Sequence, residues 1–233
     1  MQVLAVIFDL DGVLIDSEPL WEEVRRGVVT EHGGHWPPGT RERLMGMNTV
    51  EWAVYLADEL LDGTVTPDEV AYEVIDRMHR RYAEGVPILP GAVAAVRRLA
   101  EDFPLGLNSS SPRILMELVL GSLGLDALFR ATVSTEEVDQ GKPAPDGYLT
   151  AARRLDTPPG RCAAIEDSAE GFRSAHAAGM RVIAVPRPGN PPPPDALALV
   201  SHTAADLDAV TADTIRKAGA APRPGLGPGP GPA

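Results

Sequence analysis

Cysteine and lysine are the scarcest reactive side chains in this 233-residue chain. The single cysteine, Cys162, rules out an internal disulfide bond. Only two of the 21 basic residues are lysines, Lys142 and Lys217, and the others are arginines. Any chemistry that needs the amine of a lysine side chain must therefore use one of these two residues.

Long apolar runs and excess positive charge are also missing from the sequence. No apolar stretch approaches the roughly 18 residues that a membrane-spanning helix needs. The first residues include no basic segment, and Asp9 interrupts the apolar run, so we expect no signal peptide and a cytoplasmic location. The net charge of −12 disfavours nucleic acid or an anionic membrane as a partner, because both bind basic surfaces.

Short apolar segments alternate with helical segments through most of the chain. Segment 3–8 is continuously apolar, which is typical of a strand buried on both faces. Further strands are predicted at 105–107, 131–134, 162–165 and 182–185, with helices at 93–101 and near 114–121, 146–155 and 171–178. This alternation predicts an α/β fold with a doubly wound parallel sheet.

The region after the first strand has a different pattern, because it is helical throughout. Helices are predicted at 18–31 with Ser17 as N-cap, at 51–61, and at 67–82 with Thr66 as N-cap. We therefore expect a small α-helical cap domain at 17–86, inserted into a core domain of residues 1–16 and 87–218. Residues 219–233 are mostly glycine and proline and are expected to form a disordered tail.

Polar residues follow the predicted strands, at the edge of an open α/β sheet where ligands bind. They comprise acids, hydroxyl groups, an amide and one amine: Asp9, Asp11, Asn108, Ser109, Ser110, Lys142, Glu166 and Asp167. Mg²⁺ prefers oxygen ligands, and it is usually held by one or two carboxylates together with substrate phosphate. The combination therefore predicts a site for a hard divalent cation and a phosphate group.

Individual roles follow from the chemistry of these groups. Residues i and i+2 of an extended segment face the same way, so Asp9 and Asp11 are expected to point toward one ligand. Asp9 and Asp167 can supply the metal carboxylates, while Lys142 and the Ser109 hydroxyl can hold phosphate oxygens. Two close carboxylates disfavour double ionisation, so one can attack phosphorus while the other carries a proton.

Four motifs together resemble the haloacid dehalogenase superfamily of phosphohydrolases. They are DLDG at 9–12, the strand-end Ser109 (with Ser110 as the alternative register), GKPAPD at 141–146 and IEDS at 165–168. The helical insert resembles the cap of the β-phosphoglucomutase-like branch of that superfamily. Within this branch, DGVLIDSEPLW and VPRPG most resemble sugar and hexitol phosphate phosphatases, including the 2-deoxyglucose-6-phosphatase type.

The resemblance implies roles for the matching positions. It implies that Asp9 is the nucleophile that becomes an aspartyl-phosphate and that Asp11 is the general acid/base, with its backbone carbonyl on Mg²⁺. The resemblance also implies that Glu166 supports the metal site. From its position after Pro145, Asp146 is expected to cap its helix and to tether Lys142. Further substrate contacts are expected from Asn108 and Ser110 in the core and from Glu18, Trp21 and Asn48 in the cap.

These observations predict a Mg²⁺-dependent, monomeric phosphatase that hydrolyses a small phosphorylated sugar or polyol. One alternative is a phosphosugar mutase, although Thr49 stands where such mutases have an arginine, with Arg41 and Arg43 nearby. A second alternative is a phosphosugar-binding module without catalysis, which the fold alone would permit. A phosphonate hydrolase is excluded, because it needs a cap lysine and none precedes Lys142.

Overall fold

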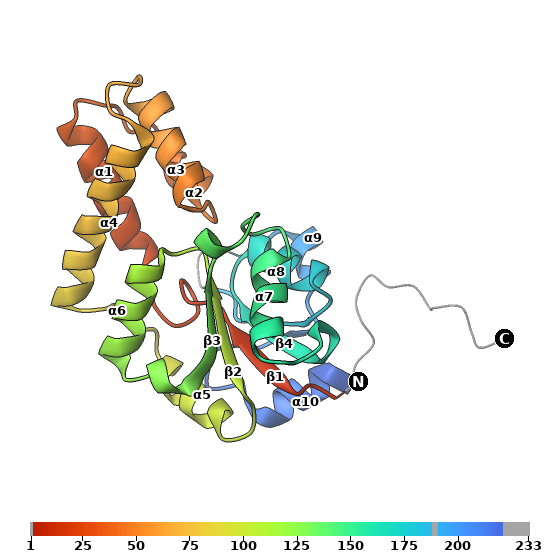
Figure 1. Cartoon of the computed structure of the whole chain (residues 1–233). Coiled ribbons are helices and arrows are strands. Elements are labelled where there is room, and N and C mark those ends of the chain that lie inside the picture. Colours follow the sequence, from red (N-terminus) through yellow and green to blue (C-terminus); the bar gives the residue numbers. More distant parts are fainter. Residues whose placement is uncertain (1, 188–190, 221–233) are drawn as a thin grey trace.

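A six-stranded sheet forms the centre of the computed structural model, which describes residues 2–187 and 191–220 (Figure 1). All neighbouring strands are parallel, and their order is β3-β2-β1-β4-β5-β6. The strands are β1 Ala5–Phe8, β2 Leu105–Ser109, β3 Phe129–Ser134, β4 Cys162–Glu166, β5 Arg181–Ala184 and β6 His202–Thr203. The predicted doubly wound parallel sheet is confirmed.

Helices cover both faces of this sheet. Val6 and Phe8 of β1 pack in one apolar cluster, whereas Ala5 and Ile7 pack in another, because successive side chains of a strand point to opposite faces. The first cluster includes side chains of α5 Ala92–Ala100, α6 Arg113–Leu123 and α10 Ala212–Ala220, and the second includes those of α7 Asp146–Arg154, α8 Ala169–Ala177 and α9 Pro194–Leu197. Short 3₁₀ turns occur at Asp126–Leu128, Thr135–Glu137 and Pro159–Arg161.

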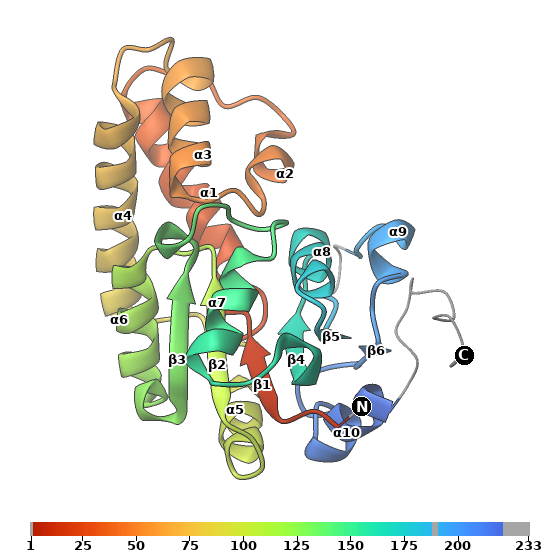
Figure 2. The same ribbon diagram turned by 45° about the vertical axis from the view of Figure 1, so that its right-hand side comes forward.

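A separate group of helices stands beyond the carboxyl ends of the strands (Figures 1 and 2). It consists of α1 Glu18–Glu31, α2 Thr40–Leu44, α3 Thr49–Tyr55, a π-helical turn Leu56–Leu60 and α4 Pro67–Glu84. We call this group the helical lobe. Thr66 caps α4 as predicted, since its hydroxyl accepts a hydrogen bond from the Glu69 N–H and the Glu69 side chain accepts one in return.

Two chain connections join the helical lobe to the sheet, and they run side by side. The Asp16 N–H donates to the Pro87 carbonyl at 2.7 Å, and the Leu89 N–H donates to the Leu14 carbonyl at 3.0 Å. The assignment of residues 17–86 as a cap domain stays a prediction.

Ser17 occupies the predicted N-cap position of α1, although its side chain makes no capping hydrogen bond. Two other local expectations were wrong. Asp146 begins α7 behind Pro145 without capping it. α10 continues to Ala220, so residues 219 and 220 do not belong to the predicted tail; residues 221–233 lie outside the described part of the chain. Over the described residues, no helix combines the length and apolarity needed to cross a membrane.

Candidate active site

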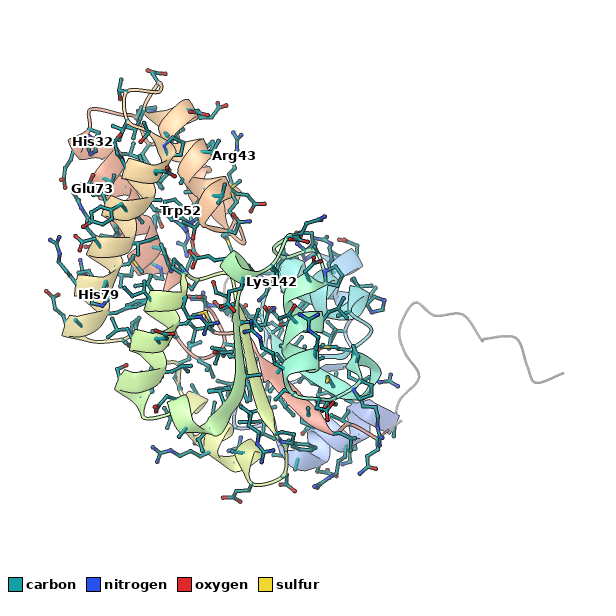
Figure 3. The ribbon with its side chains drawn as sticks, in the orientation of Figure 1. His32, Arg43, Trp52, Glu73, His79 and Lys142 are labelled. Atoms are coloured by element: carbon teal, nitrogen blue, oxygen red, sulfur yellow. The ribbon has the colours of Figure 1, made fainter. Side chains whose placement is uncertain are left out.

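A cavity of about 320 Å³ is lined by residues at the carboxyl ends of the strands and by residues of the helical lobe. Trp52 of the lobe and Lys142 of the sheet domain both line it, from opposite sides (Figure 3). Asp9, Asp11 and Asp167 also line it. The predicted edge of the sheet is therefore where the cavity lies.

Three carboxyl groups come together at the cavity floor because β1 and β4 are neighbours. Phe8 pairs with Ile165, so Asp9 and Glu166 follow directly on adjacent strands. Carboxylate oxygens of Asp9, Glu166 and Asp167 all lie within 4.8 Å of one another. Ser168 caps α8, since its hydroxyl accepts from the Gly171 N–H at 3.0 Å, which leaves the Asp167 carboxylate available to the cluster.

Gly12 allows the first turn to approach this cluster. Its φ of +88° is left-handed, and a Cβ atom there would stand 2.0 Å from Oδ2 of Asp167. Only a residue without a side chain therefore brings the backbone after Asp9 so close to Asp167.

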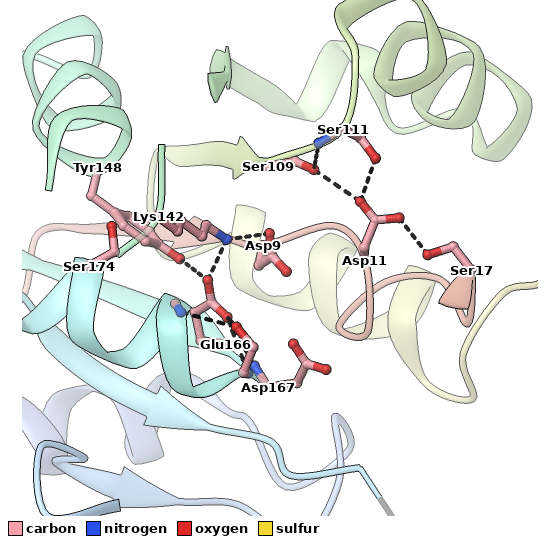
Figure 4. Close-up of polar contacts among 12 residues, drawn as sticks. Asp9, Asp11, Ser17, Ser109, Ser111, Lys142, Tyr148, Glu166, Asp167 and Ser174 are labelled. Atoms are coloured by element: carbon pink, nitrogen blue, oxygen red, sulfur yellow. Dashed lines mark hydrogen bonds and ion pairs between the residues drawn. The ribbon is translucent and has the colours of Figure 1, made fainter. Parts of the chain in front are cut away.

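Lys142 joins the acidic residues (Figure 4). Its Nζ donates to Asp9 Oδ1 at 2.7 Å and to Glu166 Oε1 at 2.5 Å, and the side chain is buried. Glu166 is itself fully buried, and its Oε1 also accepts from the Tyr148 hydroxyl at 2.8 Å. Oε1 therefore has two donors, Lys142 and Tyr148. The Lys142–Pro143 peptide bond is cis. Within the described part of the chain, the carboxylates that pair with Lys142 are Asp9 and Glu166, and the predicted tether Asp146 is not one of them.

Burial controls the charge of this cluster. Burial, reinforced by nearby carboxylates, raises the pKa of Asp9 above its ordinary value and that of Asp167 to about 7. Burial alone would lower the pKa of Lys142, but Asp9 and Glu166 outweigh it and raise the value. One ammonium faces three carboxyl groups, so an added divalent cation would offset the excess negative charge and reverse the shifts of the carboxylates. The set of hard oxygen donors therefore fits Mg²⁺.

Asp11 differs from the expectation, because its carboxylate is held away from this cluster. Oδ1 accepts from the Ser17 hydroxyl at 2.5 Å, and Oδ2 accepts from Ser109 at 3.1 Å and Ser111 at 2.7 Å (Figure 4). The argument from i and i+2 assumed extended backbone, whereas β1 ends at Phe8 and a tight turn follows. Asp9 and Asp11 line one cavity, but only Asp9 belongs to the cluster of three carboxylates.

The polar residues after β2 divide into buried and cavity-lining positions. Ser109 is fully buried and donates to Asp11, whereas Ser110 and Ser111 line the cavity. Asn108 is also fully buried, with its amide packed so closely on α7 that a Cβ on Gly147 would lie 2.2 Å from its Oδ1. Ser111 and Tyr148 were not singled out from the sequence, because one serine among three and one helical tyrosine form no recognisable motif.

The helical lobe supplies the remaining wall. Of the three predicted contacts, Glu18 and Trp21 line the cavity, whereas Asn48 caps α3 by accepting from the Glu51 N–H at 3.0 Å. Sequence reasoning missed Arg25 and Arg187, which also line it. Arg187 lies in the VPRPG segment, but the resemblance assigned it no contact, and Arg25 lies in no motif, so only the fold places both at the cavity.

Gly171→Ala tests the tight packing behind the cluster. A Cβ at this position in α8 would stand 2.0 Å from the Glu166 carboxyl carbon and from both of its oxygens, so Glu166 must move and Lys142 with it. Because displacements near 1 Å can cost about 100-fold in rate, we expect kcat to fall by about that factor in steady-state assays. Gly121→Ala in α6 is the control, since an added Cβ there meets no atom of the described residues within 4 Å and activity should not change. Equal activity of both variants would contradict the packing argument.

Comparison with known proteins agrees with this geometry. Residues 3–179 match the haloacid dehalogenase-like hydrolase family. The chain belongs to that family. Hexitol phosphatase B of Escherichia coli (strain K12) is 38% identical over 193 residues, which cover 80% of this chain and 85% of that protein. Fructose-1-phosphate phosphatase YqaB of the same strain is 31% identical over 181 residues, covering 77% of this chain and 95% of that protein.

A solved structure of this haloacid dehalogenase-like fold is also similar. β-Phosphoglucomutase from Clostridium difficile superposes with a TM-score of 0.81 at 22% identity, over 94% of this chain and 98% of that one. This likeness concerns the fold alone. The arginines weighed for a mutase do not reach the cavity lining: Arg41 lies 3.4 Å from Glu22, and Arg43 stacks on Tyr55 at 4.2 Å.

Proposed function

We propose that this chain is a Mg²⁺-dependent phosphatase that acts, as a monomer, on a small phosphorylated sugar or polyol through an aspartyl-phosphate at Asp9. The observation that carries the proposal is the buried contact of Asp9 with the Lys142 ammonium beside Glu166 and Asp167. Membership of a hydrolase family and two relatives named as sugar or hexitol phosphatases support phosphoric monoester hydrolysis.

The first step is attack of an Asp9 carboxylate oxygen on phosphorus, with departure of the alcohol. Lys142 neutralises phosphoryl oxygens next to Asp9, and Ser109 and Ser110 supply hydrogen-bond donors at the end of β2. Glu166 orients Lys142, because its oxygens already accept from Lys142, Tyr148 and the Asp167 and Ser168 backbone. Mg²⁺, held by Asp9 and Asp167 and by the Asp11 carbonyl, would supply positive charge to the phosphoryl group.

Proton transfer falls to Asp11. Its carboxyl group gives a proton to the leaving oxygen and later takes one from the water that hydrolyses the aspartyl-phosphate. Rotation of the Asp11 side chain away from Ser17, Ser109 and Ser111 would bring it to the substrate. Ser17 immediately precedes α1, so its hydrogen bond to Asp11 links the proposed acid/base to the helical lobe. The paired connections near 16–18 and 85–90 would act as hinges for closure of the lobe.

A panel of phosphate monoesters tests this function. With Mg²⁺ present, we expect phosphate release from hexose or hexitol phosphates, and loss of that activity when the metal is chelated. Conversion of a hexose 1-phosphate into its isomer without phosphate release would instead establish a mutase. Tight binding of the esters without turnover would establish the non-catalytic module.

Metal binding should depend on pH in a definite direction. A carboxyl group whose pKa is raised in the folded state stabilises the fold at low pH, and this contribution is lost as the pH rises through about 7 for Asp167. Mg²⁺ needs the ionised carboxylates, so its stabilising effect grows over the same range. We expect Mg²⁺ to raise Tm more at about pH 8 than at about pH 6 in thermal unfolding. Asp167→Asn should remove the difference between the two pH values. If Mg²⁺ raised the Tm of wild type equally at both pH values, the proposed metal site would be contradicted.

A further inference from the structure

Arg25 is a buried charged residue to which the proposed mechanism gives no role. It lies on α1 with only 6% of its surface exposed, although charged residues are rarely buried without partners. Its guanidinium carbon is 4.5 Å from the ring centroid of Trp21 and 5.0 Å from that of Trp52. Among the described residues, its buried Nε has no hydrogen-bond partner.

The two tryptophans determine how this side chain can be used. They are neighbours, with ring centroids 6.1 Å apart, and both contact the guanidinium. Stacking on indole holds a planar guanidinium in place and leaves its N–H groups at the edge. Arg25 lines the cavity that also contains Asp9 and Lys142, so this edge is available to a ligand seated over the phosphate site.

Glu18 provides an acceptor on the same side of α1. It stands seven residues before Arg25, which is about two helical turns, and both line the cavity. Burial raises the pKa of Glu18, whereas burial lowers that of Arg25 to about 10, which leaves the guanidinium charged at neutral pH. In the described structure, no ion pair within 4.0 Å joins Glu18 to Arg25, whereas Arg41 lies 3.9 Å from Glu18. Arg25 and Glu18 can therefore still form hydrogen bonds with a ligand in this buried wall of the cavity.

We infer that Arg25 and Glu18 together determine specificity by binding hydroxyl groups of the substrate at the end remote from its phosphate. This inference rests on the proposed phosphatase function and narrows its substrate class. A hydroxyl group both donates and accepts, so adjacent hydroxyls of a polyol can bridge a guanidinium and a carboxylate. A second phosphate or a carboxylate can accept from the guanidinium but has no hydrogen to donate to Glu18, so it would leave that carboxyl group without a donor. The substrate selected is therefore a polyhydroxylated monophosphate rather than a bisphosphate or an acid phosphate.

Substrate selectivity tests this assignment. Arg25→Met and Glu18→Gln are each compared with wild type on a hexitol 6-phosphate and on p-nitrophenyl phosphate, which has no hydroxyl chain. Because a hydrogen bond to a charged group is worth about 10- to 100-fold, we expect kcat/KM for the hexitol phosphate to fall by that factor in Arg25→Met, mainly through KM. Activity on p-nitrophenyl phosphate should change by less than about threefold, which also reports correct folding. Arg26→Met, at the neighbouring exposed arginine, is the matched control and should retain the selectivity of wild type.

Binding without turnover separates this inference from the proposed function. In the Asp9→Asn protein, ligand binding can be titrated by tryptophan fluorescence without turnover, because Trp21 and Trp52, two of the three tryptophans, line the cavity. Adding Arg25→Met should lower the affinity for hexitol 6-phosphate by about 10-fold or more. The affinity for inorganic phosphate should fall by less than about twofold. Three results would overturn the inference. The first is an equal loss of affinity for both ligands, and the second is unchanged substrate selectivity in both Arg25→Met and Glu18→Gln. The third is tighter binding of a hexose bisphosphate than of the hexitol phosphate, if Arg25→Met abolishes that binding. Wild type that binds the hexitol phosphate selectively but hydrolyses no ester would refute the phosphatase proposal alone.

Discussion

Asp9→Asn is expected to abolish phosphate release from every phosphate monoester, by about 10⁴-fold or more in kcat, because an amide cannot serve as the nucleophile. The asparagine would keep the shape of the aspartate at the end of β1, and Lys142 would keep Glu166 as its charged partner. We therefore expect the variant to fold and still to bind substrate. Steady-state kinetics with Mg²⁺ measure the loss of kcat, and a thermal unfolding curve shows whether the variant is folded.

Asp58→Asn is the matched control for this substitution, since Asp58 lies exposed in the π-helical turn of the lobe. Its activity should equal that of wild type. If Asp9→Asn retained more than about one-tenth of wild-type kcat, a nucleophile other than Asp9 would have to carry the reaction.

Lys142→Met should have the second largest effect, on activity and on stability together. Methionine has a similar length but no charge, so Asp9 and Glu166 would face each other without a cation while both are buried. Removing one member of a buried ion pair typically costs about 3–5 kcal/mol, and loss of the charge that offsets the phosphoryl oxygens should lower kcat by about 10³-fold. Denaturant unfolding without Mg²⁺ measures the first quantity, and phosphate release measures the second.

The chain contains its own control for Lys142. Lys217 is the only other lysine, its side chain is 75% exposed, and it pairs with Asp213 one helical turn away in α10. Exposed pairs of this kind contribute about 0–1 kcal/mol, so Lys217→Met should leave stability and activity nearly unchanged. Two lysine variants with equal effects would show that Lys142 has no special place in the site.

The sheet and its catalytic edge were accessible from the sequence because local patterns determine them. Continuous apolar strands alternate with helices, and parallel strands bring their carboxyl ends to one edge. The grouping of Asp9, Lys142, Glu166 and Asp167 could therefore be expected from the sequence. In the structure the carboxylates of Asp9, Glu166 and Asp167 lie within 4.8 Å of one another, and Lys142 forms ion pairs with Asp9 and Glu166. Thr66 was equally accessible, since a capping box requires only residues three positions apart.

Features that depend on long-range packing were not accessible. The orientation of Asp11 follows from serines 6, 98 and 100 residues away. The guanidinium of Arg25 stacks on Trp52, which lies on another helix, and no sequence spacing predicts a contact between these two residues. β6 has only two residues, His202 and Thr203, both exposed, so it carries no apolar pattern.

The sheet domain and the helical lobe thus have different proposed roles. Residues at the strand ends carry the phosphoryl chemistry, whereas α1 and α3 of the helical lobe surround the far side of the cavity. The relatives named for hexitol phosphates and for fructose 1-phosphate differ in substrate although they match the same chain.

The most direct test of the account is to identify the residue that is phosphorylated during turnover. The enzyme is mixed with Mg²⁺ and a hexitol phosphate, quenched in acid after a few milliseconds, reduced with borohydride and digested for mass spectrometry. Borohydride converts an aspartyl-phosphate into homoserine, so the account predicts homoserine at position 9 and unchanged aspartate at positions 11 and 167. Reduction at another residue, or none while phosphate is being released, would contradict it.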